Sequence, residues 1–132
     1  MISKRIRSAP IKLRRCLCAL YVTIISLVSL TRGDALNTFD HFPIHADKVF
    51  HFFAYCVLGA TLCWAFPIEE PNAYGVLTLI VVTCAFYGLI LEGLQALIET
   101  INRDFSFGDA VANTAGSIAG ATAWRRYVGM ST

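Results

Sequence analysis

The sequence predicts an all-α, polytopic membrane protein folded as a four-helix transmembrane bundle. Hydrophobic residues make up 56% of the 132 residues and charged residues only 15%, whereas about 25% is usual for a soluble domain. The charged residues gather in short clusters, and the uncharged gaps between them cover 16–31, 49–68, 71–91 and 110–124. Because a spanning helix needs about 20 mostly apolar residues, each gap is a candidate span. The length allows a single membrane domain over residues 1–132.

The first three predicted spans cover approximately 13–31, 48–67 and 72–92. The second and third gaps meet the required length directly. The first is short, but it can extend back over Ile11 and Leu13 if Lys12, Arg14 and Arg15 turn their charged ends toward the interface. A basic start followed by an apolar run also resembles a secretory signal peptide. No A-x-A-like cleavage site follows, so we interpret this segment as an uncleaved first helix.

The fourth predicted span, approximately 109–126, is rich in Ala, Gly, Ser and Thr. Its sequence AVANTAGSIAGATAW would enter a membrane poorly by itself, but small residues let helix backbones approach closely inside a bundle. Gly116 and Gly120 stand four residues apart and share one helix face. We expect these two glycines to serve helix packing rather than ligand binding. Pro67, Pro71 and Asn72 mark the turn between the second and third helices.

The five cysteines predict packing rather than chemistry. They lie in apolar stretches and their number is odd, which argues against a disulfide framework. Free cysteine commonly behaves as a small buried apolar residue, and no spacing here resembles a zinc site. His51, Glu92 and Asp109 could hold a divalent ion, but their unrelated spacing does not predict one. The sequence therefore predicts no metal and no cofactor.

The basic residues predict the orientation of the helices. Eight of the eleven lie toward the two ends of the chain: Lys4, Arg5, Arg7, Lys12, Arg14, Arg15, Arg125 and Arg126. Lys and Arg mark the cytoplasmic side of a membrane protein. We therefore expect a multi-pass protein of the cytoplasmic (inner) membrane with both termini in the cytoplasm. Most acidic residues fall on the opposite, external face.

Polar side chains gather where three predicted helices reach the external face. The second helix begins with Asp47, His51 and Tyr55 at intervals of four, which places them on one face. The third ends with Glu92 and Gln95 on one face, and the fourth begins in the same region. Ionisable residues inside spans are costly and often mark function, so we predict a ligand-binding site here. Its residues are Asp47, Lys48, His51, Tyr55, Glu92, Gln95, Arg103, Ser106, Asp109 and Asn113.

Several of these residues also have a simpler structural interpretation. Asp47 and Asp109 could cap their helices, or Ser106 could cap the fourth helix with Asp109 completing a capping box. Arg103 could anchor the chain at the membrane interface. The convergence of six ionisable groups on one face favours a functional site. The sequence does not assign partners within this group.

Two blocks of the sequence resemble the VanZ-like family, a set of small bacterial membrane proteins. The segment DKVFHFFAYCVLG, residues 47–59, is similar to the signature Asp-Lys-x-x-His-Phe-x-x-Tyr-x-x-Leu-Gly. Residues 92–120 are similar to a second block, Glu-x-x-Gln, then Arg, then Ser-x-x-Asp-x-x-x-Asn, then Gly-x-x-x-Gly. One departure is the segment ETINRDFSF, which lacks the Pro that relatives often have near the Arg. The ten predicted site residues are the motif residues that this resemblance implies.

The resemblance also implies a role in the cell envelope. The family's namesake confers resistance to the glycopeptide antibiotic teicoplanin, which bears a lipid tail. Our leading hypothesis is therefore a binding module whose external pocket holds the head group of an envelope lipid or of an amphiphilic antibiotic. In that case Arg103 and Lys48 would meet phosphate or carboxylate groups.

Two alternatives belong to other functional classes. One is an intramembrane enzyme acting on an envelope lipid, in which His51 pairs with Glu92 or Asp47 as a general acid–base. Ser106 would be a nucleophile in that enzyme if His51 lies beside it. The other is a structural scaffold of an envelope complex. Membrane lipids are the expected partners and nucleic acids are not, and the sequence leaves the oligomeric state open.

Overall fold

The prediction of an all-α protein is confirmed. The computed structural model describes residues 9–31, 46–66, 73–98 and 105–129, and these residues form four helices and no strand. The helices are α2 (Ile11–Ser29), α4 (Ala46–Ala65), α5 (Ala73–Leu97) and α6 (Phe107–Gly129). The third of these, α5, continues past Glu92, where the predicted span ends, to Leu97.

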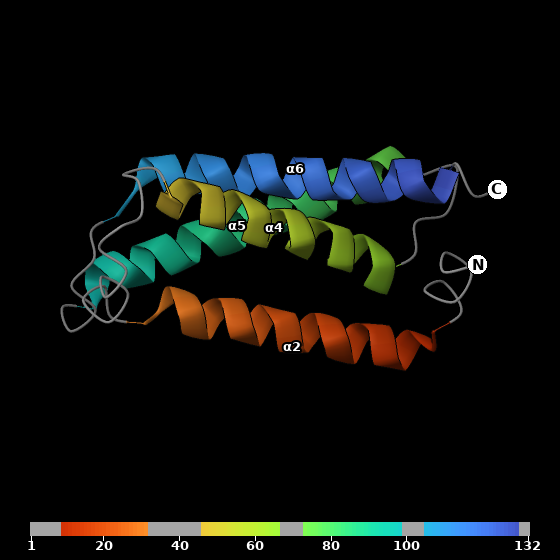
Figure 1. The fold of residues 1–132 in the computed structure, drawn as a ribbon, viewed down its shortest axis with the longest axis horizontal. Coiled ribbons are helices and arrows are strands. Elements are labelled where there is room, and N and C mark those ends of the chain that lie inside the picture. Colours follow the sequence, from red (N-terminus) through yellow and green to blue (C-terminus); the bar gives the residue numbers. More distant parts are fainter. Residues whose placement is uncertain (1–8, 32–45, 67–72, 99–104, 130–132) are drawn as a thin grey trace.

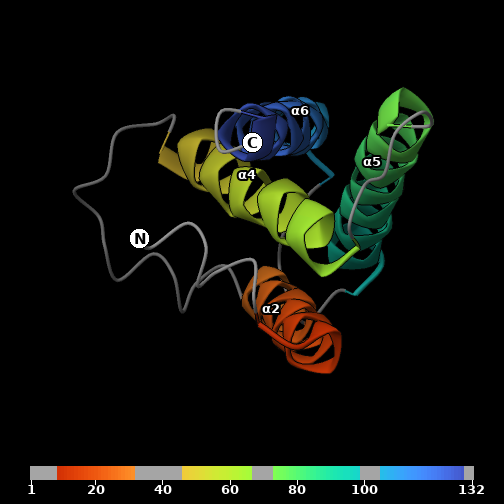
Figure 2. The ribbon, with the colours of Figure 1, turned by 90° about the vertical axis from the view of Figure 1, so that its right-hand side faces the viewer.

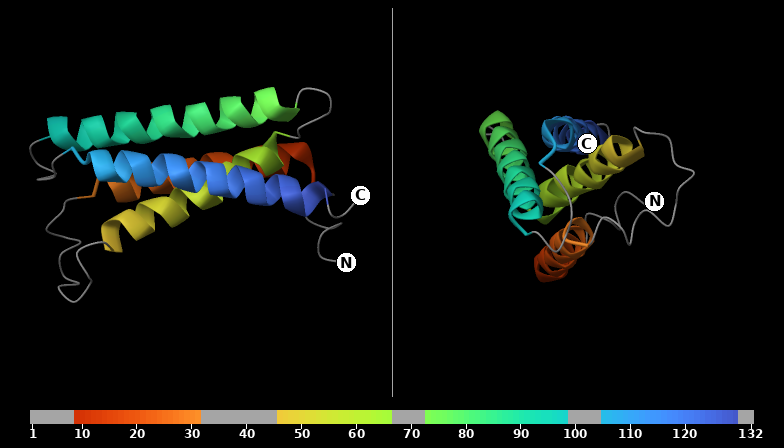
Figure 3. Two further views of the ribbon diagram at one scale, coloured as in Figure 1. Left: turned by 90° about the horizontal axis from the view of Figure 1, so that it is seen from above. Right: turned by 90° about the vertical axis from the view of Figure 1, so that its left-hand side faces the viewer.

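The four helices run alternately up and down along one axis. Figure 1 shows that α2 and α5 end, and α4 and α6 begin, at the same end of the bundle. The central helix is α4, which lies between α2 and α6 and contacts all three of the others, as the views along the bundle in Figure 2 and Figure 3 also show. This alternation brings residues that are distant in sequence to one end of the molecule.

The closest packing joins α4 to α6. Gly116 and Gly120 of α6 lie directly against the backbone of α4. A Cβ atom at Gly116 would collide with the carbonyl oxygen of Phe52, and one at Gly120 would collide with that of Cys56. The two helix backbones therefore touch at positions where any side chain would separate them, a packing mode typical of membrane helices.

Hydrogen bonds from tyrosines fasten α2 to the other helices. The hydroxyl of Tyr21 donates to the carbonyl oxygen of Ala54 on α4 at 3.0 Å. In the reverse direction, the hydroxyl of Tyr87 on α5 donates to the carbonyl oxygen of Val22 at 2.9 Å. A hydrogen bond of this kind is favoured in an apolar interior, because a polar group left there without a partner is costly.

The outer face of the bundle is apolar on every helix. Large apolar side chains stand exposed at Leu27 of α2, Phe53 of α4, Phe86 of α5 and Ile118 of α6. A soluble monomer rarely leaves so much apolar surface open to water. Hydrocarbon chains of a bilayer would match this surface.

Two helices are long and apolar enough to cross a membrane by length and composition, in the segments Asp47–Ala65 of α4 and Ala73–Leu97 of α5. Length and composition therefore support two of the four predicted spans, those formed by α4 and α5. The other two helices have mixed compositions: α2 carries basic residues in its first turns, and α6 consists largely of Ala, Gly, Ser and Thr. Small residues make a helix less apolar on average even where they suit it to close packing.

The interior is apolar over most of its length. Leu58 and Cys63 of α4 and Ile80 and Cys84 of α5 belong to one buried cluster that also includes residues of α2 and α6. All five cysteines are free, and Cys63 and Cys84 fill core positions as small apolar residues do. Polar side chains enter the interior only toward the end of the bundle where α4 and α6 begin, apart from Ser117 among the buried residues described.

We expect Gly120→Val to destabilise the protein strongly, because the new side chain would force the backbones of α4 and α6 apart. Overpacking of this kind typically costs about 1–3 kcal/mol or more, equivalent to a fall of roughly 10 °C in melting temperature. Thermal unfolding in a mild detergent measures it. Gly93→Ala is the matched control, because a Cβ atom there meets nothing within 4 Å. Equal melting temperatures for the two variants would show that the α4–α6 contact is not close.

Candidate functional site

One end of the bundle holds polar side chains that are buried in an apolar protein. It lies where α4 begins, α5 ends and α6 begins (Figure 1). Glu92 and Asn113 are each 1% exposed, whereas the side chains of Asp47 and Lys48 are 51% and 45% exposed. The site therefore has a buried floor and an open rim. We call it the polar cluster, formed by Asp47, Lys48, His51, Glu92, Asp109 and Asn113.

His51 stands at the centre of the polar cluster. Its Nδ1 atom lies 3.0 Å from Oδ1 of Asn113 and 4.0 Å from Oε1 of Glu92. Its Nε2 atom lies 3.7 Å from Oδ1 of Asp47, one turn earlier on α4. Because the amide oxygen of Asn113 can only accept a hydrogen bond, Nδ1 of His51 must be the donor. In neutral imidazole the lone pair then belongs to Nε2.

An ion pair crosses from α4 to α6 beside His51. Nζ of Lys48 lies 3.3 Å from Oδ1 of Asp109. Asp109 is buried and lies in the first turn of α6, where the positive end of the helix dipole stabilises its negative charge. The side chain of Lys48 is 45% exposed, whereas that of Asp109 is 4% exposed. The lysine therefore reaches a buried carboxylate from the open rim.

Ser106 caps α6 and ties that helix to α5. Its Oγ accepts a hydrogen bond from the backbone N–H of Asp109 at 3.2 Å, and its own N–H donates to Oε2 of Glu92 at 3.2 Å. Of the capping alternatives for α6, the structure has the one in which Ser106 is the cap. Within the residues described, Ser106 makes no hydrogen bond to His51. The geometry therefore gives no support to Ser106 as a nucleophile.

Two predicted site residues lie beside the polar cluster. Nε2 of Gln95 donates to the carbonyl oxygen of Ser29 at 2.6 Å, which ties α5 to the end of α2. Tyr55 lies one turn beyond His51 on α4, and its fully buried hydroxyl has no hydrogen-bond partner among the residues described. Arg103 lies outside the described residues.

The hydroxyl of Tyr55 reaches the floor of the polar cluster at Gly88 of α5. A Cβ atom at Gly88 would lie 3.2 Å from that hydroxyl and 2.9 Å from Nδ2 of Asn113. Both polar groups therefore lie directly against Gly88, and a side chain at position 88 would collide with them. Gly88 was not predicted from the sequence. No sequence pattern distinguishes a glycine at a site from a glycine that serves helix packing when both lie inside an apolar helix.

Acidic side chains outnumber basic ones among the described residues of the polar cluster. The acidic residues are Asp47, Glu92 and Asp109, and the basic residue is Lys48. Carboxylates that are ionised together repel one another in a medium of low dielectric constant. The cluster as described would therefore bind a cation or a hydroxyl group more readily than an anion.

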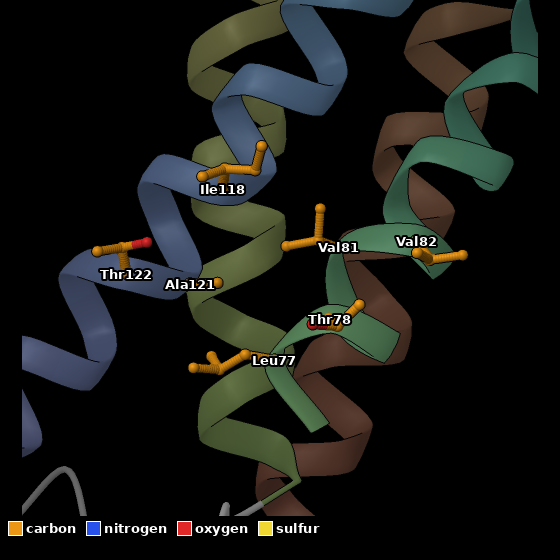
Figure 4. Close-up of a pocket in the computed structure, with 7 residues that line it drawn as sticks. All are labelled: Leu77, Thr78, Val81, Val82, Ile118, Ala121 and Thr122. Atoms are coloured by element: carbon orange, nitrogen blue, oxygen red, sulfur yellow. The ribbon is translucent and has the colours of Figure 1, made fainter. Parts of the chain in front are cut away.

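A separate groove of about 240 Å³ lies between α5 and α6. Figure 4 shows the residues that line it: Leu77, Thr78, Val81, Val82, Ile118, Ala121 and Thr122. Apart from two threonines the lining is apolar, and along each helix it lies turns away from Glu92 and Asp109. The groove has no group that would recognise a charged ligand, so it is not part of the candidate site.

Comparison with known families identifies the class of protein. A family model described as VanZ/LLP1 matches residues 9–128, which extends over all four helices. The chain belongs to the VanZ/LLP1 family. The resemblance of residues 47–59 and 92–120 to VanZ-like proteins is thus confirmed, and the chain is a VanZ-like membrane protein. No curated protein and no solved structure matches it.

The fold brings together the two blocks of this sequence that resemble VanZ-like proteins. The first block, 47–59, is the beginning of α4, and the second, 92–120, contains the end of α5 and most of α6. The glycines of the second block lie against the backbone of the first. Across the same interface His51 contacts Asn113, and Lys48 contacts Asp109. The two blocks therefore form the two sides of one site.

We expect the ring of His51 to carry its proton on Nδ1, because Asn113 accepts a hydrogen bond from that atom. Nitrogen-15 NMR of histidine-labelled protein at mildly alkaline pH distinguishes the two tautomers, and His51→Ala assigns the signal. Asn113→Ala should shift the ring toward Nε2 protonation, whereas Thr114→Val, next to it on α6, should leave the signal unchanged. An Nε2–H tautomer in the wild type would contradict this geometry.

Proposed function

We propose that this VanZ/LLP1 protein binds the polar head group of an envelope lipid, or of a lipoglycopeptide antibiotic, in the polar cluster. One observation carries the proposal: a membrane protein keeps Glu92, Asp109 and Asn113 buried beneath an exposed polar rim. Burial of such groups is costly. Well-packed apolar residues in the same positions would often stabilise a protein equally well or better. Ionisable residues within membrane helices commonly mark a site of function.

We also propose that all four helices span the cytoplasmic membrane, with both termini in the cytoplasm and the polar cluster outside. At the opposite end of the bundle, the guanidinium carbon of Arg14 lies 5.8 Å from the ring centroid of Trp64. That of Arg125 lies 4.1 Å from the ring centroid of Tyr74. Basic residues favour the cytoplasmic face, and Trp and Tyr favour the membrane interface. Their meeting supports a cytoplasmic position for that end.

The exposed residues of α2 support its place in the bilayer. Leu20, Ile24 and Leu27 are 56%, 47% and 66% exposed, and they recur at the spacing of one helix face. In water this apolar stripe would promote aggregation, whereas the hydrocarbon chains of lipids would solvate it. The basic residues near the start of α2 can reach the interface along their own apolar stems.

An amphiphilic ligand suits a site of this shape. Its tail would stay among lipid chains along the apolar outer face, while its head group would meet Asp47 and Lys48 at the rim. The carboxylate could pair with an amine, and the ammonium group with a phosphate or a carboxylate. The same geometry supports a teicoplanin-type resistance in which the protein holds the lipid-tailed antibiotic at the membrane surface.

The contact between His51 and Asn113 favours a second candidate, an intramembrane enzyme acting on an envelope lipid. With Nδ1 hydrogen-bonded to Asn113, the lone pair on Nε2 could accept a proton from a bound water or hydroxyl group. Conversion of an envelope lipid by the purified protein tests this candidate. Conversion that survives in His51→Ala would exclude His51 as the base.

The binding function predicts that a specific envelope lipid accompanies the wild-type protein and is lost from His51→Ala. The reason is that alanine removes the group that joins floor and rim of the polar cluster. Native mass spectrometry with lipid identification, after purification in a mild detergent, measures the bound species. Thr61→Val is the control, because this hydroxyl on α4 bonds, within the described parts of the chain, only to Val57 of its own helix.

The melting temperatures of the same proteins separate binding from a structural role. A variant that loses the lipid while it melts close to the wild-type temperature supports the binding site. If neither protein carries a specific lipid and only His51→Ala is unstable, the polar cluster stabilises the bundle, and the protein is better described as a scaffold.

A further inference from the structure

The polar cluster contains a set of metal-binding groups that the sequence spacing did not predict. One ligand atom from each of Asp47, His51 and Asp109 lies within 4.8 Å of the other two. Asp47 and His51 stand one turn apart on α4, and Asp109 comes from the first turn of α6. Imidazole together with carboxylates is a common donor set for first-row divalent ions.

We propose that Asp47, His51 and Asp109 bind one divalent ion of the Mn²⁺ or Zn²⁺ type, and that this ion gives the polar cluster its affinity for the phosphate-bearing head group of an envelope lipid. The second half of this proposal rests on the function proposed above and names its ligand class. The imidazole donor favours these ions over Mg²⁺ and Ca²⁺, which prefer oxygen ligands.

The hydrogen bonding of His51 prepares this residue as a ligand. Metal-binding histidines almost always donate their second ring N–H to a carboxylate or carbonyl oxygen, which fixes the tautomer and the ring orientation. Here Nδ1 contacts Asn113 at 3.0 Å and lies 4.0 Å from Glu92. The lone pair of Nε2 is therefore held on the side of Asp47, where an ion can take it.

The buried hydroxyl of Tyr55 is an independent sign of a ligand. It has no hydrogen-bond partner among the residues described, and it lies against Gly88 beside the amide of Asn113, whose Oδ1 contacts His51. Buried polar groups nearly always find a partner in the protein or in bound solvent or ligand. A water of the hydrated ion, or an oxygen of a head group beneath it, would provide that partner.

Charge explains why an anionic head group would need the ion. Among the described residues of the polar cluster, acidic side chains outnumber the basic side chain of Lys48, so a phosphate would be repelled there. A divalent ion cancels this excess. Three protein donors also leave coordination positions open, and phosphate oxygens bind readily there.

Lys48 competes with the ion for Asp109. Its Nζ lies 3.3 Å from Oδ1 of Asp109, and its side chain is 45% exposed. An ion that binds Asp109 must displace this ammonium group or share the carboxylate with it, and like charges repel at that distance. Removal of the lysine charge should therefore tighten metal binding, although Lys48 lies at the rim of the same site.

Titration with Mn²⁺ in a phosphate-free detergent tests the metal site. Electron paramagnetic resonance measures the free ion, and nitrogen hyperfine coupling reports a histidine ligand. We expect one Mn²⁺ per wild-type chain, a loss of affinity of about tenfold or more in Asp109→Asn and His51→Gln, and no change in Thr61→Val. Lys48→Met retains all three ligands and should bind several-fold more tightly.

The metal site is overturned if the wild type has no saturable Mn²⁺ site. It is also overturned if Asp109→Asn, His51→Gln and Lys48→Met all bind with the wild-type affinity. Lys48→Met keeps the test valid if a ligand variant fails to fold, because an unchanged affinity in that variant would by itself contradict the proposed competition.

Native mass spectrometry with and without EDTA tests the bridging role. We expect phospholipid to be lost after EDTA treatment and restored by Mn²⁺. Phospholipid that stays bound without metal would overturn the bridging role while leaving the lipid-binding function intact. A wild-type protein that binds Mn²⁺ but carries no specific lipid would instead contradict the lipid-binding function and leave the metal site.

Discussion

The contact between the backbones of α4 and α6 is the constraint on which the rest of the molecule depends. At Gly116 and Gly120 no side chain separates the two helices, and larger residues would collide with carbonyl oxygens of Phe52 and Cys56. This contact sets the distance between the two helix beginnings one to two turns away. His51 can therefore reach Asn113 across the interface. A looser pair of helices would leave these groups too far apart to form one site.

The charges at that end of the bundle are arranged for accessibility as well as for stability. Ser106 and Glu92 join α5 to α6 at the floor through a hydrogen bond of 3.2 Å from the Ser106 N–H to Oε2 of Glu92. At the rim, the side chains of Asp47 and Lys48 remain exposed while they contact His51 and Asp109 respectively. A purely structural arrangement has no need for an exposed rim. We infer a bound ligand because the exposed polar rim lies above a buried polar floor.

Helix faces could be predicted from sequence, but partners between helices could not. Spacing alone placed Asp47, His51 and Tyr55 on one face, because an α-helix fixes that geometry locally. It could not show that Gln95 bonds to Ser29 of α2, or that the possible metal-binding atoms of Asp47, rather than those of Glu92, group with those of His51 and Asp109. Those relations depend on the packing of distant segments. The spanning role of α2 and α6 is equally hard to derive, since their compositions suit contact with other helices more than contact with lipid.

The most direct test of a head-group site is a distance between lipid phosphorus and the ring nitrogens of His51. Solid-state NMR of histidine-labelled protein in phospholipid vesicles measures the dipolar coupling of nitrogen-15 to phosphorus-31. We predict a clear coupling at the His51 ring, because a bound head group would lie within the polar cluster. A His51 signal without any coupling to phosphorus, in protein that melts normally, would contradict the account and leave the cluster with a structural role.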